Sequence, residues 1–152
     1  KAVHGRVPLL VEIKLPTFRT LTCALADELL REYSGSYCIE SFNPLALLWY
    51  RRHRKDVVRG QLSANLTRPV AEGGYVLCFL VQHLLLNFIG RPDFIAYCYK
   101  DTQNVSFLLN KCLYKTPVFA WTVRSQETFE KYQSKFDSVI FDSFVPTHKH
   151  SI

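Results

Sequence analysis

The chain has 152 residues, of which 48% are hydrophobic and 21% are charged. This composition supplies one globular domain with a substantial core and excludes a disordered chain. The formal net charge of +6 permits an anionic partner, such as nucleic acid, an acidic membrane surface or a phosphate ester, but does not choose among them. Five widely spaced cysteines form no C-x-x-C pair, so they predict buried free thiols in a reducing, cytoplasmic compartment and no zinc site.

Short apolar runs alternate with helical patterns along the whole chain. The first strand is expected over 9–14, followed by a helix with recurring leucines over 20–32, a strand over 37–42, and a helix over 45–53 with Asn43 as its cap and Pro44 in its first turn. Next come a strand over 57–62, a helix over 75–89, a strand over 93–97, a helix over 104–114, a strand over 117–123, a helix over 125–135 capped by Ser125, and a strand over 138–141. The apolar part of the helix at 75–89 is too short to span a membrane.

This strict alternation with short connections predicts an α/β fold with a parallel sheet and right-handed crossovers, which both a doubly wound open sheet and a (β/α) barrel provide. Unusual side chains stand at or just beyond the carboxyl ends of the predicted strands: Glu12, Lys14, Ser41, Phe42, Arg59, Gln61, Trp121 and Asp142. In a barrel these ends meet at one mouth, whereas in an open sheet they spread along an edge. The Gln61 amide could contact a substrate, but capping a loop explains it better, and a helix cap or a turn explains Asp142 at least as well as a place at the mouth. No glycine-rich phosphate-binding motif follows any strand, so nucleotide binding lacks support.

The first predicted strand carries two opposite charges at its carboxyl end. Because alternate side chains of a strand share a face, Leu10, Glu12 and Lys14 line one side of it. A carboxylate and an ammonium group on an apolar strand cost several kcal/mol unless they are paired, hydrogen-bonded or bound to a metal. The segment therefore indicates a functional site, and the alternative is an ion pair on a surface strand with no role.

Six segments, taken in order, resemble the carboxyl-terminal part of the glycerophosphodiester phosphodiesterase family. They read PLLVEIK, IESFNPLALLWYRR, VVRGQLS, PDFIAY, VFAWTVRSQETFEK and SVIFDSF, and they cover the chain from about residue 7 to 146 apart from a loop near 66–74. The resemblance implies a TIM barrel that cleaves glycerophosphodiesters to an alcohol and glycerol 3-phosphate with a divalent metal, Ca²⁺ or Mg²⁺. A hard divalent cation binds oxygen ligands, which suits a carboxylate-bearing strand.

The same resemblance implies roles for four residues. Glu12 of the E-x-K pair matches a metal ligand, and Lys14 matches the catalytic lysine near the phosphate. Trp121, in the late W-T-V strand, matches an aromatic side chain that borders the substrate pocket. Phe42, in the S-F pair with Ser41, is the second candidate for substrate binding.

The family's opening motifs have no counterpart in this chain. An H-R strand, an E-x-D strand and an H-D turn supply the family's acid–base histidines and further carboxylates, whereas His4 here lies in the loop directly before the E-x-K strand. A complete barrel needs about 250 residues. We therefore expect one domain over 1–152, an incomplete TIM (β/α)8 barrel of about the last five βα units. Its first three strands are absent, one of the six predicted strands is accessory, and 147–152 form a short tail.

The resulting expectation is a phosphodiesterase fragment that is inactive by itself, with a glycerophosphodiester as substrate. Because the strands at 9–14 and 138–141 would be open edges, we expect the missing amino-terminal half of the barrel or a second copy of the chain as partner. The alternative is a non-catalytic anion-binding module derived from the same barrel. A weaker alternative is a nucleic-acid binder acting through the basic run at 51–55, which a solvated helix end explains better.

Overall fold

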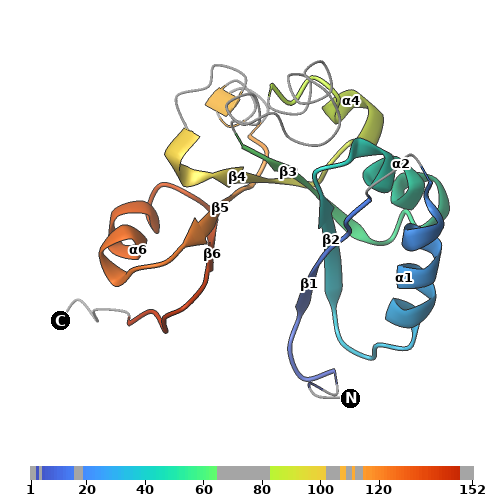
Figure 1. Cartoon of the computed structure of the whole chain (residues 1–152), viewed down its shortest axis with the longest axis horizontal. Helices are drawn as coiled ribbons and strands as arrows, with labels where there is room; N and C mark the ends of the chain where they lie inside the picture. Colours follow the sequence, from blue (N-terminus) through green and yellow to red (C-terminus); the bar gives the residue numbers. More distant parts are fainter. Residues whose placement is uncertain are drawn as a thin grey trace.

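The computed structural model describes residues 3, 5–15, 19–64, 83–101, 107–108, 111 and 115–147. Six parallel strands form one sheet in sequential order (Figure 1). The strands are β1 (Leu9–Glu12), β2 (Tyr37–Ser41), β3 (Val58–Ser63), β4 (Phe94–Cys98), β5 (Val118–Val123) and β6 (Ser138–Phe141). The helices are α1 (Leu21–Arg31), α2 (Pro44–His53), α4 (Asn87–Gly90), α6 (Gln126–Tyr132) and the short 3-10 helix η1 (Tyr99–Asp101).

The predicted strands are confirmed, and all six belong to the parallel sheet. The expectation that one of them is accessory is therefore wrong. The helix expected over 75–89 lies outside the described residues up to 82; residues 83–86 form turns, contrary to the expectation, and only the short α4 that follows them is helical. The helix expected over 104–114 falls largely outside the described residues. The predicted caps of two helices are confirmed: Asn43 accepts a hydrogen bond from the Leu45 N–H at 3.0 Å, and Ser125 accepts one from the Thr128 N–H at 3.3 Å.

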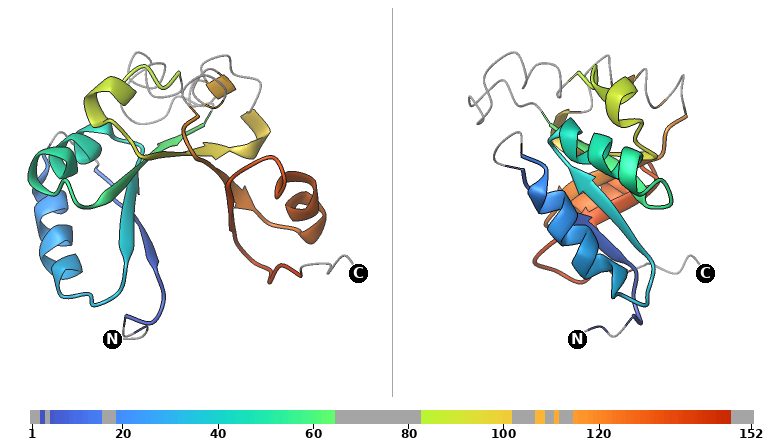
Figure 2. Two further views of the ribbon diagram at one scale, coloured as in Figure 1. Left: turned by 180° about the vertical axis from the view of Figure 1, so that it is seen from behind. Right: turned by 90° about the vertical axis from the view of Figure 1, so that its right-hand side faces the viewer.

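The sheet curls into an arch whose convex side carries the helices (Figures 1 and 2). Strand order never reverses along the sheet. A doubly wound sheet requires such a reversal, whereas sequential parallel strands that curl are the arrangement of a barrel. The architecture is that of a partial barrel, and the open-sheet alternative is excluded.

Apolar side chains pack on both sides of this arch. On the convex side, one cluster joins β1 and β2 to α1 and α2, and a second joins β4 and β5 to residues around Phe107 and Phe136. On the concave side a third cluster has Leu62, Phe94 and Ala96 at its centre. Partly buried members of the concave cluster come from the other strands: Cys38, Phe42, Phe119, Trp121 and Ile140.

Three of the five cysteines lie within the described residues, and all three are free thiols: Cys23, Cys38 and Cys98. Burial raises the pKa of Cys23 to about 11, which makes this thiol inert. Cys78 and Cys112 lie outside the described residues. No helix in the described part of the chain combines the length and apolarity needed to cross a membrane.

Both ends of the sheet are open within the described residues. β1 pairs only with β2 and β6 only with β5. Next to the β1 edge, the leucine repeat of α1 faces outward, because Leu21, Leu25 and Leu29 are 66%, 53% and 72% exposed. The same end of the molecule therefore presents the free edge of β1 and an exposed row of leucines on α1. Monomeric proteins avoid both features.

Replacing Gly60 on β3 with alanine tests the packing of the concave face. A Cβ at this position would lie 2.1 Å from the ring of Phe94, which is 3% exposed and stacks on Phe119. We expect Gly60→Ala to lower the free energy of unfolding in a denaturant titration by about 1–3 kcal/mol. The cost should shrink when Gly60→Ala is combined with Phe94→Leu, and equal costs in both backgrounds would contradict the assigned contact.

The open β1 edge predicts self-association. The N–H groups of Leu9 and Ile13 donate to the carbonyls of Ser36 and Glu40 on the β2 side, so alternation places the Leu10 N–H on the free side. Leu10→Pro removes this donor and should shift the sedimentation of the chain toward the monomer. Leu10→Ala, which loses the same side chain but keeps the N–H, is the control. A wild-type chain that sediments as a stable monomer would show that the edge is already protected.

Candidate functional site

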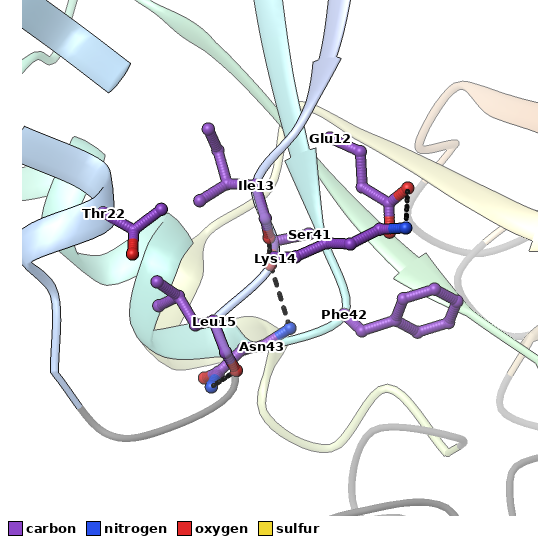
Figure 3. A pocket seen from close by; sticks show the side chains of 8 residues that line it. All are labelled: Glu12, Ile13, Lys14, Leu15, Thr22, Ser41, Phe42 and Asn43. Atoms are coloured by element: carbon purple, nitrogen blue, oxygen red, sulfur yellow. Dashed lines mark hydrogen bonds and ion pairs between the residues drawn. The ribbon is translucent and has the colours of Figure 1, made fainter. Parts of the chain in front are cut away.

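A pocket of about 760 Å³ opens where β1 and β2 end. Its walls come from the segment that follows β1, from the start of α1 and from the link between β2 and α2 (Figure 3). The lining residues are Glu12, Ile13, Lys14, Leu15, Thr22, Ser41, Phe42 and Asn43. The pocket therefore lies at the carboxyl ends of two parallel strands, where the active sites of barrels are found.

The backbone around this pocket is fixed by hydrogen bonds between the two strand ends. The hydroxyl of Ser41, which is 1% exposed, donates to the Ile13 carbonyl at 2.6 Å. The same oxygen accepts a hydrogen bond from the Asn43 N–H at 3.1 Å, and the Ile13 N–H donates to the Glu40 carbonyl at 2.8 Å. Ser41 thus holds the chain that carries Glu12 and Lys14, and it is a positioning residue.

Glu12 and Lys14 share a face of the strand segment, as alternation predicts. Their charged groups form an ion pair at 3.7 Å, with the side chain of Lys14 80% exposed and that of Glu12 35% exposed. A pair this long and this exposed contributes at most about 1 kcal/mol. Both groups are therefore available to a ligand that enters the pocket.

Glu40 is a site residue that the sequence analysis missed. It lies directly opposite Glu12 in the register of β1 and β2, it is only 7% exposed, and its Oε2 atom has no hydrogen-bond partner among the described residues. Burial, and then the charge of Glu12, raise the pKa of Glu40 to about 7. The available signal was its position two residues before Phe42, which places it on the same face of the strand.

Phe42 and Trp121 meet on the concave face, although β3 and β4 separate their strands. Their rings contact edge to face, with centroids 5.6 Å apart and an interplanar angle of 84°. The indole Nε1 of Trp121 is buried and has no hydrogen-bond partner in the described part of the chain. The fold thus brings the four predicted site residues together: three line the pocket, and Trp121 packs against one of them.

Other strand-end residues do not reach the pocket. The Gln61 amide is buried and donates to the carbonyls of Ser41, Phe42 and Leu62 at 2.9–3.1 Å. Gln61 therefore fixes a loop, as one of the two interpretations of its sequence position predicted. Arg59 makes an ion pair with Asp93 at 3.4 Å.

Asp142 also stays outside the site, because it pairs with Arg124 at 3.4 Å on the surface. The expectation that all eight strand-end side chains meet at one mouth is therefore wrong, because Arg59, Gln61 and Asp142 do not line the pocket. Gln61 and Arg59 pair in register with Ser41 and Ile39, on the face opposite Glu40.

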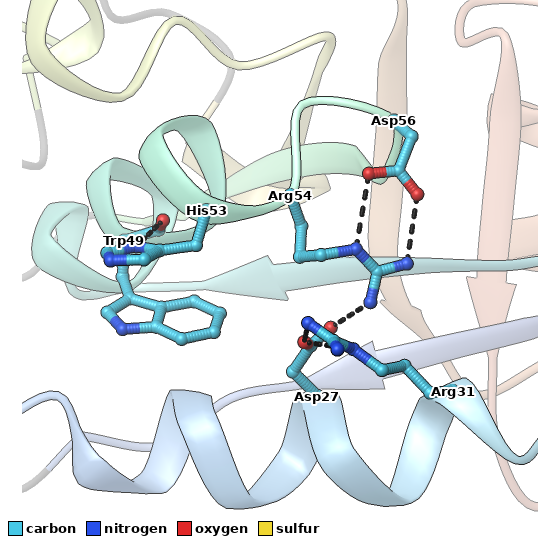
Figure 4. Close-up of polar contacts among 6 residues, drawn as sticks. All are labelled: Asp27, Arg31, Trp49, His53, Arg54 and Asp56. Atoms are coloured by element: carbon cyan, nitrogen blue, oxygen red, sulfur yellow. Dashed lines mark hydrogen bonds and ion pairs between the residues drawn. The ribbon is translucent and has the colours of Figure 1, made fainter.

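Two of the cations in the basic run at 51–55 are engaged within the protein. Arg51 donates to the Ile89 carbonyl at 2.7 Å. Arg54 bridges the buried Asp27 of α1 and the exposed Asp56 (Figure 4). These contacts fasten α2 to its neighbours, so half of the run serves the fold rather than a nucleic-acid surface.

The described residues hold no group of three or more histidine, cysteine, aspartate or glutamate side chains that could bind a metal ion. Glu12 and Glu40 are a carboxylate pair. His53 lies at the end of α2, where it stacks on Trp49 with centroids 4.6 Å apart (Figure 4). Neither described histidine, His53 or His83, lines the pocket.

No model of a known protein family matches the sequence, and no curated protein matches it. Solved structures do match. A phosphodiesterase from Oleispira antarctica, in complex with the product sn-glycerol 3-phosphate, aligns with 89% of this chain and 51% of its own at 18% identity and a TM-score of 0.63. The chain has part of the fold of a glycerophosphodiester phosphodiesterase.

Two further glycerophosphodiester phosphodiesterases support this assignment of the fold. The enzyme from Parabacteroides distasonis aligns with 89% of this chain and 52% of its own, at 16% identity and a TM-score of 0.59. The enzyme from Thermotoga maritima aligns with 87% of this chain and 52% of its own, at 17% identity and a TM-score of 0.56. This chain spans about half the length of these glycerophosphodiester phosphodiesterases, and the resemblance found in its sequence is confirmed as a shared fold.

Replacing Glu40 tests its burial next to Glu12 through the pH dependence of stability. The pKa of Glu40 is about 7 in the folded chain and 4.5 ordinarily, so between these pH values the folded state holds a proton that the unfolded chain releases. Stability is therefore full below pH 4.5 and falls as the pH rises through 7. In metal-free buffer we expect Glu40→Gln to be more stable than the wild type at pH 8, by on the order of 1–3 kcal/mol.

Well below pH 4.5 the Glu40→Gln variant and the wild type should unfold at the same denaturant concentration, because Glu40 is then protonated in both the folded and the unfolded state. Glu28→Gln on the exposed side of α1 is the matched control and should follow the wild type at both pH values. An unchanged difference between Glu40→Gln and wild type across this range would contradict the assigned burial.

Proposed function

We propose that this chain is part of a metal-dependent hydrolase that cleaves glycerophosphodiesters to an alcohol and glycerol 3-phosphate. The observation that carries the proposal is the pocket itself. Glu12, Lys14 and Phe42 line it at the carboxyl ends of β1 and β2, and Trp121 packs against Phe42. The fold shared with glycerophosphodiester phosphodiesterases supports the same reaction class.

Lys14 is proposed to bind the phosphate. The long ion pair with Glu12 leaves the Lys14 side chain 80% exposed, so its ammonium group can turn toward a phosphodiester oxygen. A cation brought to the phosphate at this position would stabilise the negative charge that develops on it in the transition state.

Glu12 is proposed to hold a divalent cation, Ca²⁺ or Mg²⁺. Its carboxylate oxygens are the donor type that such cations prefer, and Glu12 lines the pocket. Its register partner is Glu40, which has a buried oxygen with no hydrogen-bond partner among the described residues. When bound, the cation would polarise the phosphate and offset its charge. Glu12 itself fixes the position of that positive charge relative to Lys14.

Phe42 and Trp121 are proposed to shape the end of the pocket that receives the glycerol moiety. The two rings meet edge to face, and the Trp121 Nε1–H is buried with no hydrogen-bond partner among the described residues. A hydroxyl group of a bound ligand would satisfy this donor.

Acid–base catalysis is proposed to come from a segment outside this chain. General acid–base groups contribute roughly 10²- to 10⁴-fold to a rate, and neither described histidine lies at the pocket. The chain alone should therefore release no glycerol 3-phosphate from a glycerophosphodiester, even with Ca²⁺ or Mg²⁺ supplied.

The experiment supplies the missing motifs. We expect a longer protein, with a segment carrying the family's H-R, E-x-D and H-D motifs before this chain, to release glycerol 3-phosphate in a metal-dependent manner. Lys14→Met should lower kcat/KM about 10²- to 10³-fold. Lys55→Met is the control, because Lys55 is an exposed cation in the turn after α2 and should leave the rate unchanged.

A non-catalytic anion-binding module is the second candidate, favoured by the exposed Lys14 in a pocket that neither described histidine lines. The two candidates give opposite results. An inactive longer protein whose affinity for sn-glycerol 3-phosphate is lost in Lys14→Met would support the module. An inactive longer protein with no such affinity would reject both.

A further inference from the structure

We propose that Glu40 and Glu12 together bind one divalent cation, so that β2 as well as β1 supplies a ligand. This inference rests on the proposed metal dependence of the site and extends it. The resemblance in sequence assigns Glu12 alone as a ligand in this chain, whereas the structure places a second carboxylate beside it.

The first argument is the register of the two strands. Glu12 and Glu40 are direct partners in the β1–β2 pairing, and neighbouring strands lie about 4.8 Å apart. Side chains at paired positions of adjacent strands project from the same face of the sheet. Two carboxylates at this spacing can share one cation.

The second argument is the unmet requirement of Glu40. Its side chain is buried to more than nine-tenths and its Oε2 atom has no partner among the described residues. A buried carboxylate without a partner is costly. The nearby cation does not meet the need, because Lys14 extends to Glu12 and is 80% exposed.

Arg59 cannot neutralise Glu40 either. Glu40 pairs in register with Gly60, so Arg59, the residue before Gly60, projects from the opposite face of the sheet. Its guanidinium group lies near Asp93, at 3.4 Å. Among the described residues, neither Lys14 nor Arg59 forms an ion pair with Glu40.

The third argument is the chemistry of the ligand that fits. A proton can occupy only one oxygen, whereas a hard cation takes six or more oxygen ligands and can bridge both carboxylates. The adjoining pocket, of about 760 Å³, has room for the waters or phosphate oxygens that complete the coordination. Ca²⁺ and Mg²⁺ belong to this class of cation, and Mn²⁺ is a spectroscopic substitute for them.

The test measures binding of Mn²⁺ alone to the complete 152-residue chain, by electron paramagnetic resonance at pH 8 after chelator treatment. The wild type and the control Glu28→Gln, which removes a carboxylate from the outer helix α1, should bind one Mn²⁺ with equal affinity. Glu40→Gln should weaken this binding by about tenfold or more, as should Glu12→Gln. Ca²⁺ and Mg²⁺ should displace the Mn²⁺.

Far-UV circular dichroism on each variant shows whether it is folded, so that a loss of Mn²⁺ binding is not mistaken for unfolding. Glu40→Asp, which retains the carboxylate on a shorter side chain, should bind more tightly than Glu40→Gln. Wild-type affinity in a folded Glu40→Gln variant would overturn the role of Glu40, and the proposed function would stand if Glu12→Gln still loses binding. Absence of Mn²⁺ binding to the wild-type chain would also overturn the inference, whereas the proposed function is decided separately by hydrolysis in the longer protein.

Discussion

The site depends on one constraint, the register of β1 against β2 at their carboxyl ends. The Ile13 N–H donates to the Glu40 carbonyl, and the Ser41 hydroxyl returns a hydrogen bond to the Ile13 carbonyl. These two contacts set Glu12 opposite Glu40 and fix the direction in which Lys14 leaves the strand. A shift by one residue would move Glu12 to the helix-covered face, where a carboxylate would be buried among apolar side chains.

The same alternation divides the concave face into an apolar part and a charged part. Gly60 continues the row of Glu12 and Glu40, and its missing side chain gives the Phe94 ring its place. Phe94 belongs to the concave apolar cluster, which also includes the contact between Phe42 and Trp121. Of the charged groups beside this apolar surface, only Glu40 is buried, whereas Lys14 extends into water.

Local signals in the sequence were enough to predict the strands and the helix caps, because hydrophobic periodicity and a capping side chain act within a few residues. Pairing between strands is a different kind of information. Glu40 was missed because nothing in its own segment says that Glu12 lies opposite it. Gln61 was expected at the mouth of the barrel because it lies near the end of a strand. Its side chain instead projects from the face of β3 opposite Glu40, and its amide donates to the carbonyls of Ser41 and Phe42.

The candidate site lies on the strand that forms the open edge of the sheet. Glu12 belongs to β1, which pairs on one side only within the described residues, and Glu40 lies on that paired side. Any strand that covers the free side of β1 must place a side chain next to Glu12, opposite to Glu40, on the concave face. Protection of the edge and completion of the site would thus be achieved by the same segment. This coupling explains how a strand with an exposed edge can carry two charges on an otherwise apolar face: the residues that stabilise them need not come from the chain that holds them.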